Sequence, residues 1–257
     1  MPAELSFPAP VLFSFLMALA RVSGAIAFVP LPGLKGMPEQ ARAALAVCLT
    51  LTLYSRWPVM NWDGITLIRL AGMTLAEAAV GIAMGVFVAI VLEAFSMAAQ
   101  VFGVQAGYAY ASTINPETEA DSGVLVILAQ TSAALLFFAL GLHRDFLLIL
   151  ARSFESIPAG HWALSIRSAD TLIRFGSSLF STGVRQALPI VALLLMLDLA
   201  LALLGRLNQQ LQLLSLAFPL KMLLSLITLS WIAWVFPRLL VELSGQAFQA
   251  ISRATGR

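Results

Sequence analysis

The sequence predicts an all-α, polytopic membrane protein, and three observations carry this prediction. Apolar residues make up 60% of the 257 residues and charged residues only 11%, whereas soluble domains hold about 25% charged residues. The 15 basic and 13 acidic side chains cannot cover a soluble fold of this length. Several apolar stretches also reach the roughly 20 residues that a helix needs to cross a bilayer. A soluble enzyme, a nucleic-acid reader and a disordered chain are therefore excluded.

About six hydrophobic helical segments are expected, packed as hairpins. They run roughly over 9–32, 41–60, 68–101, 123–150, 183–204 and 213–237. Prolines and glycines between them, such as Pro30, Pro58 and Pro116, mark the helix ends. The third segment is too long for one perpendicular span, so it must tilt, kink or project beyond the hydrocarbon.

The basic residues predict an orientation in the membrane. Ten Lys and Arg residues fall in loops on one side of the predicted spans and three on the other. By the positive-inside rule both termini are cytoplasmic. The polar, Ser-rich segment 152–178 is then expected to form a cytoplasmic hairpin, and the first 20 residues lack the basic region of a cleavable signal peptide. Because no repeat is evident, residues 1–257 are expected to form a single domain.

Ionisable side chains lie within or beside the predicted spans, where each would cost about 2.5–3.5 kcal/mol at a helix centre. These residues are Arg21, Glu77, Glu93, Asp198, Arg206 and Lys221. One hypothesis is a proton or ion path. The other, which we favour, is that they pair with each other, with backbone carbonyls or with another subunit, because a relay of carboxylates and histidines is missing. Asp198 and Arg206 are about 80° apart on an ideal helix, so their partners are expected on other helices.

Small residues predict close helix packing in the third segment. Gly81 and Gly85 form a GxxxG pattern that is followed by Ala89, and such spacing lets helix backbones approach closely. A second GxxxG pattern, Gly103 to Gly107, precedes a polar loop instead of continuing through an apolar run.

The segment 103–123 is the least ordinary part of the chain. It combines glycines, aromatic rings and an Asn-Pro pair; its candidate gating residues are Gly103, Gln105, Gly107, Tyr108, Tyr110, Ile114, Asn115 and Pro116. Glu117, Glu119 and Asp121 follow without a basic residue. A solvated connector is one interpretation. The alternative is a re-entrant or plugging loop, because irregular backbone at membrane depth must be buried in protein or line a cavity.

The sequence contains no motif that predicts catalysis. It lacks HExxH, GxSxG, a phosphate-binding Gly-rich loop, and any group of His, Cys and carboxylates at metal-ligand spacing. We therefore expect no enzyme activity, no metal and no cofactor.

Residues along nearly the whole chain carry a resemblance to one family. They are Ala20-Arg21, Pro30, Gly33, Pro38, Arg42, Glu77, Gly81, Gly85, Gly103, Gln105, Gly107, Asn115-Pro116, Ala187-Leu188-Pro189, Asp198-Leu199-Ala200 and Phe218-Pro219-Leu220-Lys221. In this order and spacing they resemble the flagellar biosynthetic FliR family and its counterpart in virulence-associated type III secretion.

The resemblance implies a single-copy subunit of a protein export gate in the bacterial inner membrane, at the flagellar basal body. It implies assembly with several copies of two smaller membrane subunits, FliP-like and FliQ-like, and with the FlhB-like switch protein. In the family, the loop that matches 105–121 plugs the closed pore. Here Tyr108, Tyr110 and Ile114 would obstruct the channel, Gly103 and Gly107 would act as hinges, and unfolded export substrates would displace the plug.

Two other classes stay open at this stage. A secondary transporter of a small solute would need substrate groups on broken helices near the midplane, where Pro189 and Asp198 are candidates. An integral membrane enzyme is the weaker alternative, because no acid, base or nucleophile set can be named.

Overall fold

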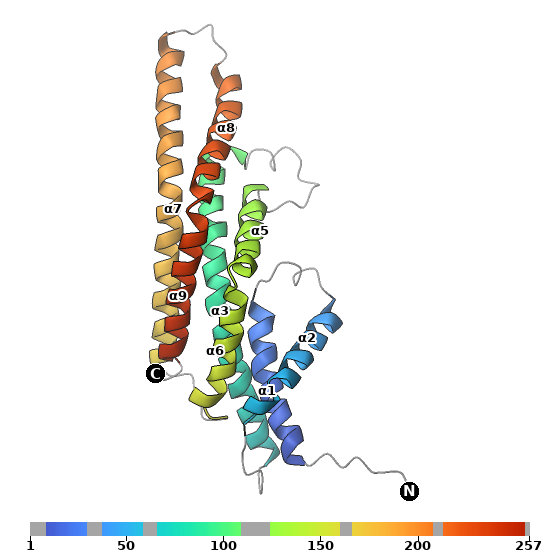
Figure 1. The fold of residues 1–257 in the computed structure, drawn as a ribbon. Coiled ribbons are helices and arrows are strands. Elements are labelled where there is room, and N and C mark those ends of the chain that lie inside the picture. Colours follow the sequence, from blue (N-terminus) through green and yellow to red (C-terminus); the bar gives the residue numbers. More distant parts are fainter. Residues whose placement is uncertain are drawn as a thin grey trace. The chain divides into compact units, whose positions relative to one another are not determined.

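A computed structural model describes residues 9–29, 38–58, 66–108, 124–159, 166–207 and 213–254. All regular elements in these ranges are helices (Figure 1), which confirms the all-α prediction. The α-helices are α1 (Ala9–Phe28), α2 (Glu39–Thr52), α3 (Leu67–Gln105), α5 (Val124–Ala139), α6 (Leu142–Ser156), α7 (Ile166–Leu207), α8 (Leu213–Ala233) and α9 (Phe236–Ala254). A short 3₁₀ helix, η1 (Tyr54–Arg56), follows α2.

The helices differ in whether they can cross a membrane. Three in the described ranges are long and apolar enough: Pro10–Phe28, Leu67–Gln105 and Ile173–Arg206. Helix α2 has 14 residues, and the apolar part of α8 is limited to Ala217–Ser230. Both fall short of the roughly 20 residues of a full span, although the sequence counted each among its six segments.

The fourth predicted segment, 123–150, is not one straight helix. Helices α5 and α6 meet at a bend of 68° and together form one broken span or a re-entrant pair. Gly141 between them has φ +73°, a left-handed conformation that glycine adopts without steric cost. Hydropathy alone did not reveal this break, because Gly141 lies between two leucines.

Two further parts of the chain are more helical than the sequence predicted. In the predicted hairpin 152–178, α6 continues to Ser156 and α7 begins at Ile166, while 160–165 lie outside the described residues. Helix α9 has no counterpart among the predicted segments. Leu240, Leu243 and Ala247 form its buried stripe and exposed Arg238 and Glu242 lie off it, so α9 is amphipathic and too polar for a hydropathy search.

The chain divides into two compact units. Unit 1 consists of Met1–Ala89, Gly141–Phe175 and Ser244–Arg257, and unit 2 of Ile90–Leu140 and Gly176–Leu243. That residues 1–257 form a single domain stays a prediction. In unit 1 the described core includes Met17 of α1 and Met73 of α3, with Phe13 packed against them.

Unit 2 has an apolar core to which α3, α5 and α7 contribute. Phe102, Leu125, Ala129, Ile190 and Leu194 are all buried there. The same core also contains the buried alanines Ala98, Ala99, Ala106 and Ala187, and such small residues let helices approach closely in membrane bundles.

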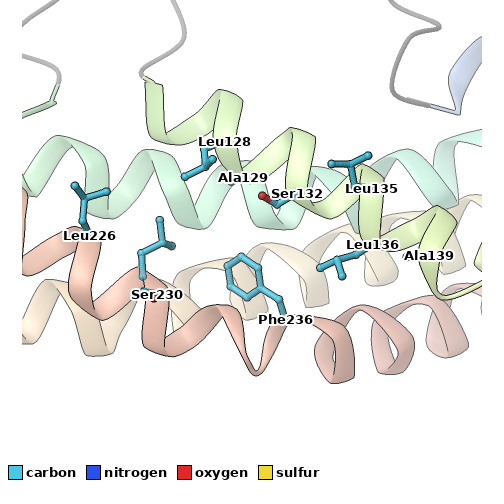
Figure 2. A pocket seen from close by; sticks show the side chains of 10 residues that line it. Leu128, Ala129, Ser132, Leu135, Leu136, Ala139, Leu226, Ser230 and Phe236 are labelled. Carbon is cyan, nitrogen blue, oxygen red and sulfur yellow. The ribbon is translucent and has the colours of Figure 1, made fainter.

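A cavity of about 510 Å³ also lies within unit 2, between α5, α8 and the start of α9. Figure 2 shows the Phe236 ring standing between the α8–α9 segment and α5. Its lining is Leu128, Ala129, Ser132, Leu135, Leu136, Ala139, Leu226, Leu229, Ser230 and Phe236. Two hydroxyl groups are the polar side chains of this lining, so the cavity offers no charge to a polar solute.

Candidate functional site

The structure describes the first part of the predicted gating segment. Gly103, Gln105, Gly107 and Tyr108 belong to the described range that ends at residue 108. The other candidates, Tyr110, Ile114, Asn115 and Pro116, lie outside the described residues. The described residues therefore include the end of α3, where the predicted plug segment begins.

Helix α3 ends in a glycine-dependent turn. The N–H of Ala106 donates to the carbonyl of Phe102 at 2.8 Å, and the N–H of Gly107 donates to the carbonyl of Val104 at 3.1 Å. Gly107 has φ +87°, and a Cβ there would lie 2.9 Å from Cδ1 of Phe218. Glycine is thus favoured at position 107 for two reasons: the backbone is left-handed, and the Phe218 ring leaves little room for a side chain. Gly103, in contrast, lies within the helix.

The next residue, Tyr108, forms a hydrogen bond to α8. Its phenol O–H donates to the backbone carbonyl of Met222 at 3.3 Å. The same carbonyl accepts a hydrogen bond from Oγ of Ser225 at 2.8 Å. Tyr108 is half-buried, with its ring against the core of unit 2, so the polar end of the side chain fixes an otherwise apolar contact.

A second hydrogen bond joins the end of α3 to α7. Nε2 of Gln105 donates to Oδ2 of Asp198 at 3.3 Å, and Nζ of Lys221 lies 2.5 Å from Oδ1 of the same carboxylate. The side chains of Lys221 and Asp198 are 16% and 35% exposed. Asp198 therefore connects three helices, with one oxygen facing the amide and the other facing the ammonium group.

We call the residues of these two hydrogen bonds, of the Asp198–Lys221 ion pair and of the turn at Gly107 the α3-end cluster. Its members, all in unit 2, are Gln105, Gly107, Tyr108, Asp198, Phe218, Lys221 and Met222. Figure 1 shows α7 and α8, which carry the partners, running beside each other. The cluster sits where the chain leaves α3 for the predicted plug segment.

A second ionic site lies in unit 1. Nε of Arg21 in α1 donates to Oε2 of Glu77 in α3 at 2.6 Å, and both side chains are fully buried. The other guanidinium nitrogens donate to Oγ of Ser153 at 3.1 Å and to the carbonyl of Ile157 at 3.2 Å. The guanidinium carbon lies 4.4 Å from the ring centroid of Phe154. The partners of Arg21 thus lie on α3, on α6 and directly after α6, and its side chain is fully buried within unit 1.

Gly81 and Gly85 lie at the contact between α1 and α3 that holds this ion pair. A Cβ on Gly81 would collide with the backbone carbonyl of Arg21, and one on Gly85 would lie 2.5 Å from the carbonyl of Ala25. Gly24 of α1 faces α3 in the same way, since its Cβ would lie 2.5 Å from the carbonyl of Ala78. The two helix backbones therefore touch through glycines.

The remaining predicted ionic residues lie on the surface of the chain. Glu93 in α3 and Arg206 in α7 are both exposed, so the structure does not join either of them to the two clusters. Their role at a subunit contact stays a prediction. Among the described residues, no group of three or more His, Cys, Asp or Glu side chains could hold a metal ion.

Sequence reasoning found the ionic residues but not their partners. It did not predict that the ring of Phe154 and the hydroxyl of Ser153 contact the Arg21 guanidinium group. It also did not pair Asp198 with Lys221, because the pairing depends on how α7 and α8 are rotated toward each other. The Phe-Pro-Leu-Lys run in α8 was part of the family resemblance, but nothing in this run indicates which residue pairs with Lys221.

Comparison with known proteins decides the family. The model of the family described as "Bacterial export proteins, family 1" matches residues 12–247. The chain belongs to this family. The match covers most of α1, all of α2 to α8 and most of α9, so it includes the larger part of each unit.

Curated relatives in this family come from distant bacteria. The chain is 27% identical over 208 residues to the flagellar biosynthetic protein FliR of Escherichia coli, covering 81% of this chain and 79% of that protein. It is 26% identical over 222 residues to FliR of Bacillus subtilis, covering 84% of each. FliR of Aquifex aeolicus is 23% identical over 221 residues, or 85% of this chain and 84% of that protein. This confirms the resemblance to the FliR family.

Proposed function

We propose that this chain is a component of the flagellar protein export apparatus, embedded in the bacterial inner membrane at the basal body. The observation that carries the proposal is the export-family match over 12–247, together with FliR relatives from several bacteria. The long apolar helices α1, α3 and α7 support a place in the membrane.

Within this apparatus, we assign the chain to the export gate, as its single-copy subunit. FliP-like and FliQ-like subunits and the FlhB-like switch protein would be its partners. The apolar surface of α7 supports this assignment: little of its apolar part, Ile173–Arg206, is buried within the chain, and Leu188, Met196 and Leu203 are exposed there. Such a surface needs lipid or neighbouring subunits around it.

Segment 103–123 would close the channel between export events. The geometry that supports this role is the end of α3: Gly107 turns the chain out of the helix, and Tyr108 and Gln105 hold the point of departure against α8 and α7. Tyr108, Tyr110 and Ile114 would fill the narrow point until an unfolded substrate displaces them. Energy for transport would come from another component, because the sequence has no nucleotide-binding motif.

The assembly part of the proposal is tested by purification in mild detergent. The chain is expected to be isolated in a large complex with two short hydrophobic proteins. Its deletion in the source bacterium should abolish flagellar protein export and leave other secretion intact. A folded, monodisperse chain without companions would contradict the gate assignment.

The plug part is tested by replacing 109–116 with a Gly-Ser linker of equal length, which keeps the chain connected and leaves Tyr108 in place. Passive leakage of small ions into cells is expected to rise while the complex assembles normally. Unchanged leakage with normal assembly would contradict the plug.

A secondary transporter finds less support in the geometry. Helix α7 runs without a break through Pro189, whereas transporter sites are typically built on discontinuous helices. Asp198, the other candidate residue, is already paired with Lys221 and Gln105.

A further inference from the structure

We propose that a stripe of α3, formed by Glu93, Met97, Gln100 and Val104, docks an apolar helix of a partner subunit, and that this helix presents an arginine or lysine to Glu93. The inference rests on the proposed function, namely that the chain assembles with other membrane subunits. It adds the surface that is covered, the polarity of the facing helix and the sign of its charge.

The four residues lie on one side of α3. An α-helix turns by about 100° per residue, so Met97, Gln100 and Val104 all lie within about 40° of Glu93 around the helix axis. Glu93, Gln100 and Val104 are exposed and Met97 is half-buried. Phe102, about 180° from Glu93 around the axis, is buried in the core of unit 2. The stripe therefore faces away from the core of its own unit.

The carboxylate of Glu93 lies in an otherwise uncharged length of helix. No charged residue lies between Glu77 and Glu93, or between Glu93 and the end of α3 at Gln105. Within the described residues, neither Glu93 nor Gln100 forms a side-chain hydrogen bond or an ion pair. A charged side chain on a membrane helix is costly unless it is paired or reaches water. The stripe thus carries a charge for which the chain itself supplies no partner.

The basic residues of unit 2 do not neutralise this carboxylate. They are Arg185, Arg206, Lys221 and Arg238. Lys221 is paired with Asp198, and the three arginines form no ion pair with any described residue. Charge complementarity therefore points to a cation from outside the chain.

The spacing of the polar side chains favours a protein helix over lipid as the source of that cation. Glu93 and Gln100 are seven residues apart, which is two helical turns and about 10.5 Å along the axis. Lipid headgroups gather in the interfacial layer, and the acyl chains beneath them offer no hydrogen-bonding group. A helix that runs alongside α3 repeats its contacts every seven residues. It can therefore pair with Glu93 and also hydrogen-bond to Gln100, as glutamine does between membrane helices.

The first test leaves the carboxylate in place. A photo-crosslinking amino acid replaces Val104, which is 68% exposed, and crosslinks formed in cells are mapped by mass spectrometry. Because Val104 is eleven residues from Glu93, we expect a crosslink to an apolar helix of another protein, with a lysine or arginine about eleven residues away on that helix. The same amino acid at Leu67, 85% exposed at the other end of α3, is the control. Crosslinks from position 104 to lipid alone, or to this chain alone, would overturn the proposal.

The second test removes the charge and keeps the shape of the side chain. In Glu93→Gln the companion proteins should dissociate from the immobilised chain more than tenfold faster in mild detergent, because the facing cation is left unpaired. Glu242→Gln is the matched control, since it makes the same change at an exposed position of α9. Gln100→Leu should accelerate dissociation by about two- to tenfold. If Glu93→Gln does not accumulate in cells, the crosslink from position 104 decides.

A charge exchange tests the sign of the partner. Glu93→Lys places two positive charges opposite each other and should accelerate dissociation more than Glu93→Gln does. When the basic residue identified by the crosslink is also replaced with glutamate, the dissociation rate should return to within about threefold of the original. Absence of any recovery in this double variant would contradict the pairing.

The outcomes separate the docking surface from the proposed function. If companions are isolated with the chain but dissociate equally fast from Glu93→Gln and Glu242→Gln, the docking surface is wrong and the assembly stands. If Arg185→Gln accelerates dissociation as much as Glu93→Gln and the double variant adds nothing, the carboxylate pairs within the chain, which also overturns the docking surface. If the original chain is isolated without companions, the proposed function itself fails.

Discussion

The two ion pairs of this chain show what burial does to the same chemistry. In unit 1, Arg21 and Glu77 are fully buried, and the guanidinium group has two further partners, Ser153 of α6 and Ile157 directly after it. In unit 2, Asp198 and Lys221 are partly exposed, and the carboxylate shares one oxygen with Gln105. A fully buried pair cannot separate without leaving charges in an apolar interior, whereas a pair at the edge can exchange its partners for water. Breaking the first pair is therefore expected to cost more free energy than breaking the second.

The largest effect is expected for breaking the buried pair. Glu77→Gln leaves the Arg21 charge uncompensated and should destabilise the purified complex by about 3–5 kcal/mol, measured by denaturant or thermal unfolding. Replacing both residues, in Arg21→Met/Glu77→Leu, removes the charge problem and should recover most of this loss. A double variant as unstable as the single one would show that the hydrogen bonds to Ser153 and Ile157 matter more than the charges.

A smaller effect is expected where the helix backbones touch beside that pair. Gly81→Ala places a methyl group against the carbonyl of Arg21, so α1 and α3 must separate and the complex should lose about 1–3 kcal/mol of stability. Gly72→Ala is the matched control in the same helix, since a Cβ there meets nothing within 4 Å. Equal melting temperatures for the two variants would contradict the close contact.

In unit 2 the corresponding test is Gly107→Ala. The left-handed backbone disfavours alanine by about 1–2 kcal/mol, and the methyl group would press on the Phe218 ring. We expect faster hydrogen exchange at the end of α3 and a modest drop in melting temperature. Gly176→Ala in α7, where a Cβ has open space, should be neutral or slightly stabilising; the same exchange rates in both variants would count against the turn.

The smallest effect is expected for a third ion pair, which is more exposed than the other two. Nε of Arg174 lies 2.7 Å from Oδ2 of Asp170 one helical turn away, with side chains 79% and 53% exposed. Arg174→Ala should change stability by no more than about 0.5 kcal/mol. A loss as large as that of Glu77→Gln would mean that burial is not what distinguishes the pairs.

Much of the fold could be predicted from the sequence, because long apolar runs and low charge leave few alternatives to membrane helices. All six predicted segments contain helix. The break at Gly141 and helix α9 were not predicted, since one is hidden among leucines and the other is amphipathic. Hydropathy reports the average environment of a run and not its bends.

The candidate site was predictable only in part. Arg21 and Glu77 are fully buried within the chain, whereas Glu93 and Arg206 are exposed on it, and the predicted contact of these two with another subunit stays a prediction. Which residue pairs with which depends on how two helices far apart in the sequence are rotated toward each other; Arg21 and Glu77, for example, are 56 residues apart. No pattern in a single sequence encodes that rotation, and the plug role of 103–123 stays a prediction.

We propose that segment 103–123 closes a protein-conducting channel, and the ion conductance of single complexes tests this proposal most directly. Purified complexes containing the original chain, or the chain with 109–116 replaced by a Gly-Ser linker, are inserted into planar bilayers at equal subunit composition. The account predicts a non-conducting original complex and stable ion currents with the linker. Equal conductance in the two complexes, whether both open or both closed, would contradict it.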